Sequence, residues 1–338
     1  MKPGSLIVST GPHWHNGARL THYSWAVLLA LVPAAAAGIN RYGLDAAGVI
    51  GLAMGSAMTA EALWQKFTRR PVTIADGSAA VSGLLLALLL PANIPAFMVI
   101  VASTLGIVLA KQCFGGLGAN PLNPALVGYA ILRITGPWAG HLDFDLMLVI
   151  YDTGFAKEYP EAVFKALGAA GLSEFHLWDL FLGRQTGGIG SSQIAWLLVG
   201  GLFLVLRGAI RWPIPAAFLA GVALASVVLN RLDSDAYARP LFNLVTGNVM
   251  IGAFFLSTEH ASSPVNRWGM LVYGLGCGLL TVVFRAWSTY GDGVVFAILI
   301  MSIFVPLLDR LRRQAMPPPP AVLFDAAAQP PASQEAAR

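Results

Sequence analysis

A short stretch between two apolar runs carries the residues with the clearest chemical potential. It extends from Lys111 to Pro124 and contains one cation, three glycines and two asparagines, namely Lys111, Gly115, Gly116, Gly118, Asn120 and Asn123. Asparagine before proline is typical of a helix start, and the glycines allow positive φ or a close approach to another group. Within a membrane, the free amides of such a break must face protein, a cavity or a ligand. A tight loop between two ordinary helices is the alternative.

Three charged residues outside the turn are further candidates. Arg285 occupies the place in the second half of the chain that Lys111 occupies in the first; each could add positive charge to a site or extend to the membrane interface. Asp76 and Glu259 are carboxylates near the ends of apolar segments, so either could belong to a cation path. Asp76 is also well placed to cap a helix, and Glu259 with His260 could be an interfacial pair.

The composition indicates an integral membrane protein. Hydrophobic residues make up 56% of the 338 residues, charged residues only 11%, and the mean hydropathy is +0.67. The net charge of +4 is therefore attributed to loop lysines and arginines rather than to a nucleic-acid surface. Cys113 and Cys277 are far apart in sequence and suggest neither a disulfide framework nor a metal site. No nucleotide-binding, Walker or Cys-x-x-Cys motif is present, so we predict no catalytic residue and no metal ligand.

Ten apolar segments predict an all-α, polytopic fold of about ten transmembrane helices in two inverted five-helix repeats with broken helices. The predicted segments are 24–39, 46–64, 78–90, 95–110, 124–136, 193–207, 213–230, 240–257, 267–285 and 293–308. Arg70-Pro71 and Arg239-Pro240 precede matching segments, and five crossings per repeat require opposite orientations. The distribution of loop lysines and arginines places both termini in the cytoplasm.

These segments divide the chain into five parts. We expect a cytoplasmic N-terminal segment at 1–23, the first repeat at 24–136, an extracytoplasmic loop at 137–192, the second repeat at 193–311 and a disordered tail at 312–338. The pair His13 and His15 in the first part is assigned to a surface role.

Several motifs resemble the RnfD/NqrB family of membrane subunits of ion-translocating oxidoreductases. They are Lys111 to Leu132, Asp76-Gly77-Ser78, Leu84 to Pro91, Gly187-Gly188-Ile189-Gly190, Gly252-Ala253-Phe254-Phe255, Ser262-Ser263-Pro264-Val265 and Val305 to Arg310. The similarity covers roughly residues 10–312, and the hydrophilic N-terminus resembles RnfD better than the longer NqrB.

The resemblance implies electron transfer through a membrane-held flavin, coupled to sodium or proton movement. Family members usually carry FMN on the threonine of a Ser/Thr-Gly-Ala-Thr motif. The corresponding stretch here runs from Tyr151 to Pro160, and the motif is missing. Thr153 is the nearest threonine. Three interpretations remain: FMN held without a covalent bond, FMN absent with a structural role retained, or attachment at another hydroxyl such as Thr186. We favour non-covalent or absent FMN, with the glycine turn, Lys111 and Arg285 as candidate phosphate contacts.

The resemblance thus predicts an integral subunit of an Rnf-type electron transport complex in the bacterial cytoplasmic (inner) membrane. Its expected partners are the other Rnf-type subunits, of the A, B, C, E and G types, the lipid bilayer, and sodium ions or protons, without nucleic acid. A channel or transporter-like protein and a flavin-free assembly scaffold are the alternatives, because inverted repeats with broken helices serve all three roles.

Overall fold

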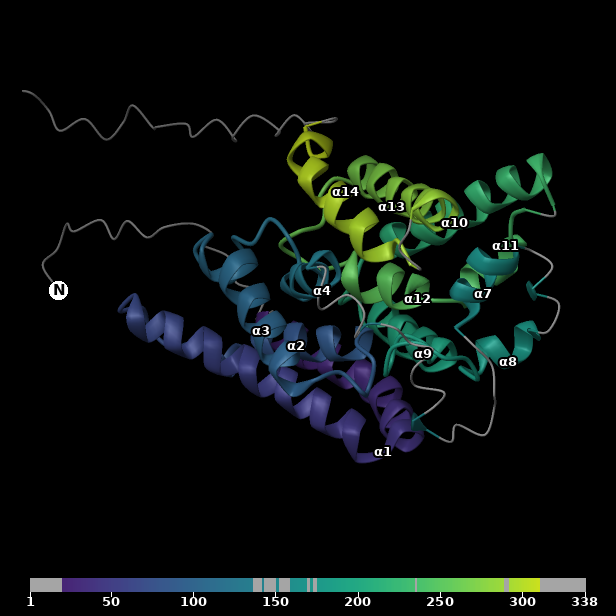
Figure 1. The fold of residues 1–338 in the computed structure, drawn as a ribbon. Coiled ribbons are helices and arrows are strands. Elements are labelled where there is room, and N and C mark those ends of the chain that lie inside the picture. Colours follow the sequence, from purple (N-terminus) through teal and green to yellow (C-terminus); the bar gives the residue numbers. More distant parts are fainter. Residues whose placement is uncertain are drawn as a thin grey trace, which may run out of the picture.

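All regular secondary structure in the part of the chain that the computed structural model describes is helical. The described residues are 20–135, 142, 150–151, 159–168, 171–172, 175–234, 236–288 and 292–310, and none of them lies in a strand (Figure 1). Thr153, His13, His15 and the predicted tail at 312–338 lie outside these residues. The predicted all-α, polytopic fold is confirmed.

The first two predicted segments join end to end in α1 (Leu20–Phe67). Gly43 interrupts this helix with φ 68° and ψ −146°, a conformation that only glycine adopts without strain. A 48-residue helix is about 72 Å long at 1.5 Å per residue, far longer than one membrane crossing. Gly43 therefore divides α1 into two limbs. The first limb begins at Leu20, earlier than the predicted start at residue 24.

Three shorter units complete the first half, and each agrees closely with a predicted segment. They are α2 (Ser78–Leu89), α3 (Ala96–Ile107) continued by the π-helix η2 (Val108–Gln112), and α4 (Pro124–Ile134). α2 is only about 18 Å long and is mostly buried against α1 and α4. α3 packs directly on α4, because Gly128 leaves no room for a Cβ atom, which would lie 2.5 Å from the Ala102 carbonyl oxygen.

The described part of the long loop contributes two short helices, α7 (Pro160–Leu167) and α8 (Leu177–Phe181). The second half follows as α9 (Ile194–Leu206), α10 (Pro213–Leu232), α11 (Pro240–Val245), α12 (Val249–Ile251), the π-helix η5 (Gly252–Leu256), α13 (Arg267–Trp287) and α14 (Val294–Leu308). The predicted segment 240–257 is broken at Gly247, where φ is 60°. Counting α11 to η5 as one interrupted unit, the described residues hold five apolar units in each half.

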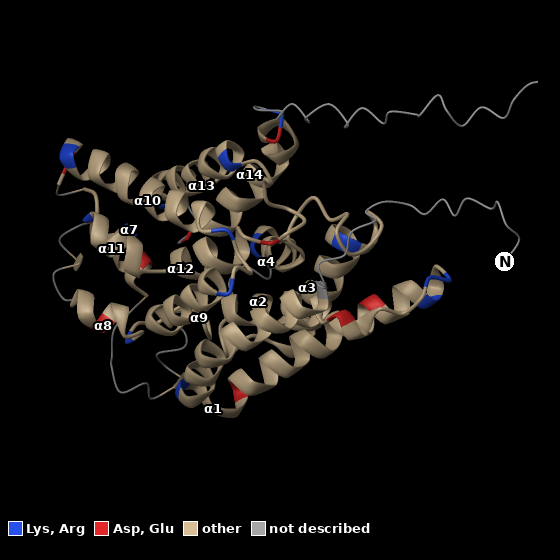
Figure 2. Ribbon diagram, turned by 180° about the vertical axis from the view of Figure 1, so that it is seen from behind, with Lys and Arg blue, Asp and Glu red and all other residues tan. Residues whose placement is uncertain are grey.

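Only some of these units are long enough for a complete crossing. By length and apolar composition, three described helices qualify: α1, α10 and α13. Five further described helices are apolar but shorter: α2, α3 with η2, α4, α9 and α14. Charged residues are sparse and lie mostly at helix ends and in connections, with a few inside the bundle (Figure 2). This pattern is typical of broken and tilted helices in a membrane protein.

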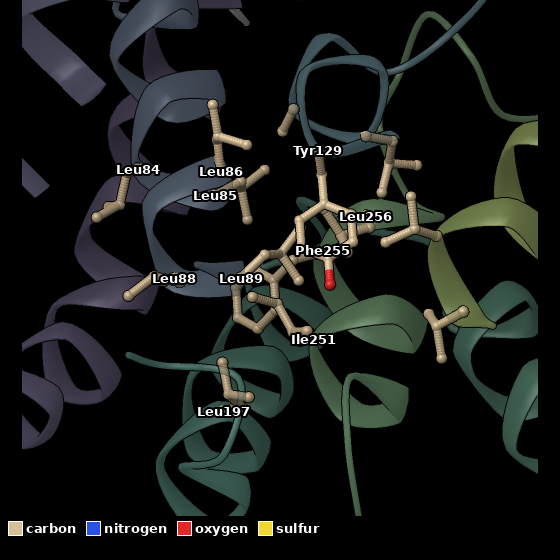
Figure 3. Packing of buried hydrophobic residues seen from close by; sticks show 14 of the residues in the cluster. Leu84, Leu85, Leu86, Leu88, Leu89, Tyr129, Leu197, Ile251, Phe255 and Leu256 are labelled. Carbon is tan, nitrogen blue, oxygen red and sulfur yellow. The ribbon is translucent and has the colours of Figure 1, made fainter. Parts of the chain in front are cut away.

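One hydrophobic core joins the two halves. Leucines of α2 and Tyr129 of α4 face Leu197 of α9, Ile251 of α12 and Phe255 of η5 (Figure 3). These side chains are buried, so the broken helices of both halves meet inside the protein rather than at its lipid-facing surface.

Candidate functional site: two buried charge clusters and a central cavity

A buried ion pair lies at the end of α3, where the helix widens into η2. We call Glu61, Gln65, Ser78, Lys111 and Gln112 the Lys111 cluster. Lys111 Nζ lies 2.7 and 2.9 Å from the two carboxylate oxygens of Glu61 and 2.6 Å from Ser78 Oγ. Lys111 and Glu61 are only 2% and 0% exposed. The π-turn is closed by the Cys113 amide, which donates to the Val108 carbonyl, and it directs both Lys111 and Gln112 inward.

Glu61 neutralises the Lys111 ammonium, and two glutamine side chains also donate to the Glu61 carboxylate. Gln112 Nε2 donates to Glu61 Oε1 at 2.9 Å, and Gln65 Nε2 donates to the same oxygen at 3.3 Å. An ammonium has three N–H donors, and three acceptor atoms surround it here. Lys111 therefore neither extends to the membrane interface nor keeps a donor for a phosphate.

Asp76 is committed to the start of α2. Its Oδ1 accepts from the Ser78 amide at 2.8 Å and from Ser78 Oγ at 2.6 Å. Gly77 between them has φ 75°, so the turn requires glycine. Asp76 thus caps α2 and is linked to Lys111 through the Ser78 hydroxyl.

The glycine turn connects the two halves of the chain. Gly115, Gly116 and Gly118 all have positive φ, from 87° to 118°. Asn123 caps α4 by accepting from the Ala125 amide at 3.0 Å, and its Nδ2 donates to the Leu256 carbonyl. Asn120 Nδ2 donates to Glu259 Oε1 at 2.9 Å. Both asparagines therefore fasten the turn to the second half.

A second buried cluster surrounds Arg285 near the end of α13. We call Glu161, Asn243, Thr246, Arg285 and Asp292 the Arg285 cluster. Arg285 Nη2 lies 2.8 Å from Glu161 Oε1, and Nε lies 3.3 Å from Asp292 Oδ1. The guanidinium also donates to the Asn243 and Thr246 carbonyls at 2.9 Å. Arg285 is 2% exposed, so it too is held inside the protein.

Glu161 reaches this cluster from the long loop rather than from a predicted span. It lies in the first turn of α7, and burial raises the pKa of its carboxyl to about 7, although Arg285 opposes the shift. Asp292 accepts from the Asn248 amide at 2.6 Å. Gly247, at the break between α11 and α12, leaves room for the Glu161 and Arg285 side chains. A Cβ atom on Gly247 would overlap Glu161 Oε1 and lie 2.6 Å from Arg285 Nη2.

The two clusters are equivalent in the two halves. Each pairs a cation near the end of a helix with a hydroxyl beside a positive-φ glycine, Ser78 beside Gly77 and Thr246 beside Gly247. They differ in charge, because Lys111 meets one carboxylate whereas Arg285 meets two.

A cavity of about 160 Å³ lies beside the Lys111 cluster, between the halves. We call it the central cavity. It is lined by Tyr23, Ser24, Val27, Ser78, Val81, Ser82, Leu85, Lys111, Leu117, Gly118, Asn120, Asn123, Phe255, Glu259, His260 and Ala261. Glu259 is its acidic group: Asn120 donates to one carboxylate oxygen and Ser262 Oγ to the other, at 3.1 Å. Partial burial raises the pKa of the Glu259 carboxyl to about 7. The Tyr23 and His260 rings lie 3.9 Å apart at the cavity wall.

The void beside the Arg285 cluster is much smaller, about 10 Å³, which is at or below the space that one water molecule needs. The central cavity, at about 160 Å³, has room for several waters. Among the described residues, the space beside the Lys111 cluster is therefore far larger than the space beside the Arg285 cluster.

Comparison with known proteins identifies the family of this chain. Residues 7–316 match the model of the NQR2, RnfD, RnfE family. The chain belongs to this family. It is 36% identical to the D subunit of the Na⁺-translocating ferredoxin:NAD⁺ oxidoreductase complex of Acetobacterium woodii, over 92% of this chain and 94% of that one. It is 33% identical to the D subunit of the proton-translocating ferredoxin:NAD⁺ oxidoreductase complex of Clostridium ljungdahlii, over 92% and 95%. It is 34% identical to the D subunit of the ion-translocating oxidoreductase complex of Escherichia coli O7:K1, over 90% and 96%. The predicted family resemblance is confirmed.

The central cavity and the two charge clusters do not fit FMN. The central cavity is smaller than the roughly 300–1,000 Å³ of pockets that hold drug-sized ligands. Lys111 and Arg285 are both saturated by protein partners. Thr186 is buried between α8 and α9, and Thr153 lies outside the described residues.

Three acidic residues of the clusters escaped the sequence analysis. Glu61 lies inside the predicted segment 46–64, where an isolated carboxylate marks a candidate functional position. Asp292 stands between two glycines at a predicted helix start, which is also a recognisable signal. Glu161 looked like one of several acids in a polar loop, and no local pattern distinguished it.

Proposed function

We propose that this chain is the D-type membrane subunit of an Rnf-type complex in the bacterial cytoplasmic membrane. Both termini face the cytoplasm, and the partners are the A-, B-, C-, E- and G-type subunits. The proposal is supported by relatives that are named as D subunits and match over nine-tenths of their length, and by the polytopic helical fold. Because the named relatives differ in their ion, sodium and protons are both retained as candidate coupling ions.

Within the complex, we assign this chain a share in the coupled ion path. The observation that carries the assignment is the central cavity, a mostly apolar space at the junction of the halves that has the Glu259 carboxylate in its wall. A small hydrated cation fits this volume, and Glu259 supplies the negative charge. Lys111 does not repel the cation strongly, since Glu61 already neutralises it. Asp76 remains the cap of α2.

The assignment is tested in the assembled complex by measuring ion uptake during electron transfer. Glu259→Gln keeps the shape of the side chain but removes its charge, and we expect the apparent affinity for the coupling ion to fall about tenfold or more. Asp179→Asn is the matched control, because Asp179 pairs with Arg184 at the surface. Unchanged ion uptake by the Glu259→Gln complex would exclude Glu259 from the path.

FMN is proposed to be bound without a covalent bond at a surface shared with other subunits, or to be absent. This is supported by the missing attachment motif and by the small size of the central cavity. The test compares flavin fluorescence of the complex before and after acid denaturation with the intact mass of the denatured chain. We expect no FMN on the chain. A mass increase equal to FMN would show attachment at an unrecognised hydroxyl.

The channel alternative predicts passage through the isolated chain. The Arg285 cluster argues against it, because the void found beside it among the described residues measures only about 10 Å³. Ion or solute flux through liposomes that contain only this chain would favour the channel.

A further inference from the structure

A wide groove lies at the end of the fold where α9 ends and α10 and α13 begin. Its volume is about 1,430 Å³. It is lined by Val205, Gly208, Ile210, Arg211, Trp212, Pro213, Val265, Asn266, Arg267, Trp268, Met270 and Asp309. Neither charge cluster nor the central cavity contributes a residue to it, so it is a separate site.

Two arginines give the groove a positive wall. Arg211 Nη1 donates to the Val265 carbonyl at 2.7 Å, which holds the two connecting loops together and leaves its other N–H groups available. Arg267 is exposed and makes no hydrogen bond or ion pair with the part of the chain that the structure describes. Asp309 is the acid of the groove, and its Oδ1 accepts from the Val265 and Asn266 amides at 2.9 and 3.2 Å. That carboxylate is thus committed to the loop, and the arginines outnumber it.

Two tryptophans place the groove at the boundary between lipid and water. Trp212 and Trp268 are 65% and 55% exposed and flank the arginines in sequence. Tryptophan is enriched at this boundary because one side of the ring is apolar and the N–H is polar. Exposed apolar side chains continue along the adjoining helices, at Leu206 of α9 and at Leu271 and Val272 of α13.

We propose that this groove binds the headgroup of an anionic phospholipid. A lipid phosphate matches the planar donor fork of a guanidinium, and the neighbouring apolar helix faces accommodate the acyl chains. A soluble anion would use the arginines but not the tryptophans and the apolar faces. In the proposed orientation the groove also faces the cytoplasmic leaflet, whose lipids attract basic residues.

The test measures lipid binding to the purified full-length chain in detergent by native mass spectrometry. Phosphatidylglycerol is titrated against phosphatidylcholine, and inorganic phosphate is added as a competitor. We expect Arg211→Gln/Arg267→Gln to weaken phosphatidylglycerol binding about tenfold or more, since each basic residue near an anionic lipid adds to the affinity. Binding of phosphatidylcholine is expected to stay unchanged.

Two further variants make the result specific. Arg231→Gln/Arg239→Gln removes two exposed arginines flanking the connection between α10 and α11 and is expected to bind phosphatidylglycerol as the original chain does. Arg211→Lys/Arg267→Lys keeps the charges but loses the planar donor forks, so its binding should be intermediate between that of the original chain and that of Arg211→Gln/Arg267→Gln. Equal losses in the groove variant and the control, or no loss in either, would overturn the proposal. Displacement of phosphatidylglycerol by millimolar inorganic phosphate would also overturn it, because the groove would then recognise the free anion.

Discussion

At the scale of single residues, the stability of the fold depends on keeping its buried charges paired. Glu61 is fully buried, and three side chains stabilise its carboxylate, with Lys111 the only cation among them. A buried carboxylate without its cation is costly, whereas replacing both partners by apolar groups is often neutral.

Lys111→Met should therefore lower the free energy of unfolding by about 3–5 kcal/mol. Glu61→Leu/Lys111→Met is expected to recover most of that loss, because no buried charge remains. Unfolding in increasing concentrations of a denaturing detergent measures both variants. A double variant as unstable as Lys111→Met would show that the ion pair is not the cause.

Glu259 makes the central cavity sensitive to pH. Its pKa is raised to about 7 by burial, so the carboxyl is neutral at pH 6 and increasingly charged toward pH 8. Because the folded protein then holds this proton more tightly than the unfolded chain does, stability is expected to fall as pH rises from the ordinary value of about 4.5 to about 7, and to level off above it.

The affinity of the central cavity for cations should rise with pH, whereas the stability of the fold falls. We expect affinity for the coupling ion to increase between pH 6 and pH 8, by at most about tenfold per pH unit. In Glu259→Gln this dependence should disappear. Isothermal titration of the coupling ion into each purified complex at several pH values measures the affinity. An equal pH dependence in the original and the Glu259→Gln complexes would mean that another group titrates.

At the scale of elements, the broken helices need glycines for two separate reasons: a positive φ and a lack of room for a Cβ atom. Gly77 and Gly247 both have positive φ, and Gly247 also lies against the Glu161 carboxylate. Gly208 has a similar φ of 71°, but a Cβ there would contact nothing within 4 Å. Comparing Gly208 with Gly247 separates backbone strain from crowding.

Gly208→Ala is expected to cost only the left-handed strain, about 1–2 kcal/mol. Gly247→Ala should cost several kcal/mol more, because the new methyl group displaces Glu161 and leaves a buried charge incompletely paired. Thermal unfolding of the two variants in the same detergent provides the comparison. Similar losses would indicate that α7 simply moves aside.

Much of the element order could be predicted from sequence, because each span is an apolar run bounded by glycine, proline or charge. The caps at Asp76 and Asn123 and the positive φ of the glycine turn followed from residue type alone. The long-range partners could not be predicted: the Lys111–Glu61 and Arg285–Glu161 pairs join distant segments without any periodic pattern. The π-helices were also missed, because a five-residue hydrogen-bonding step has no distinctive composition.

At the scale of the whole molecule, orientation in the membrane determines which end of the fold meets the other subunits. The chain has two cysteines: Cys113 is exposed in the glycine turn and Cys277 is buried in α13. The native protein thus carries one accessible thiol at a defined end, beside the central cavity.

A membrane-impermeant maleimide should label Cys113 in inverted membrane vesicles and leave it unmodified in intact cells, because the turn is expected in the cytoplasm. Gel shift of the chain measures the labelling, and Cys113→Ser should abolish it. Labelling in intact cells would reverse the proposed topology and place the central cavity on the outer side.

The two π-helices, η2 and η5, contribute Lys111 and Phe255 to the lining of the same cavity. Each π-turn contains one residue more than the α-turn it replaces, so the face that follows it depends on that single extra residue. Removing Leu109 would restore an α-turn and rotate everything beyond it by about 100°. Lys111 would then leave Glu61, and the glycine turn would lose its alignment with Glu259. This segment is therefore expected to tolerate substitution of its side chains far better than insertion or deletion of a residue.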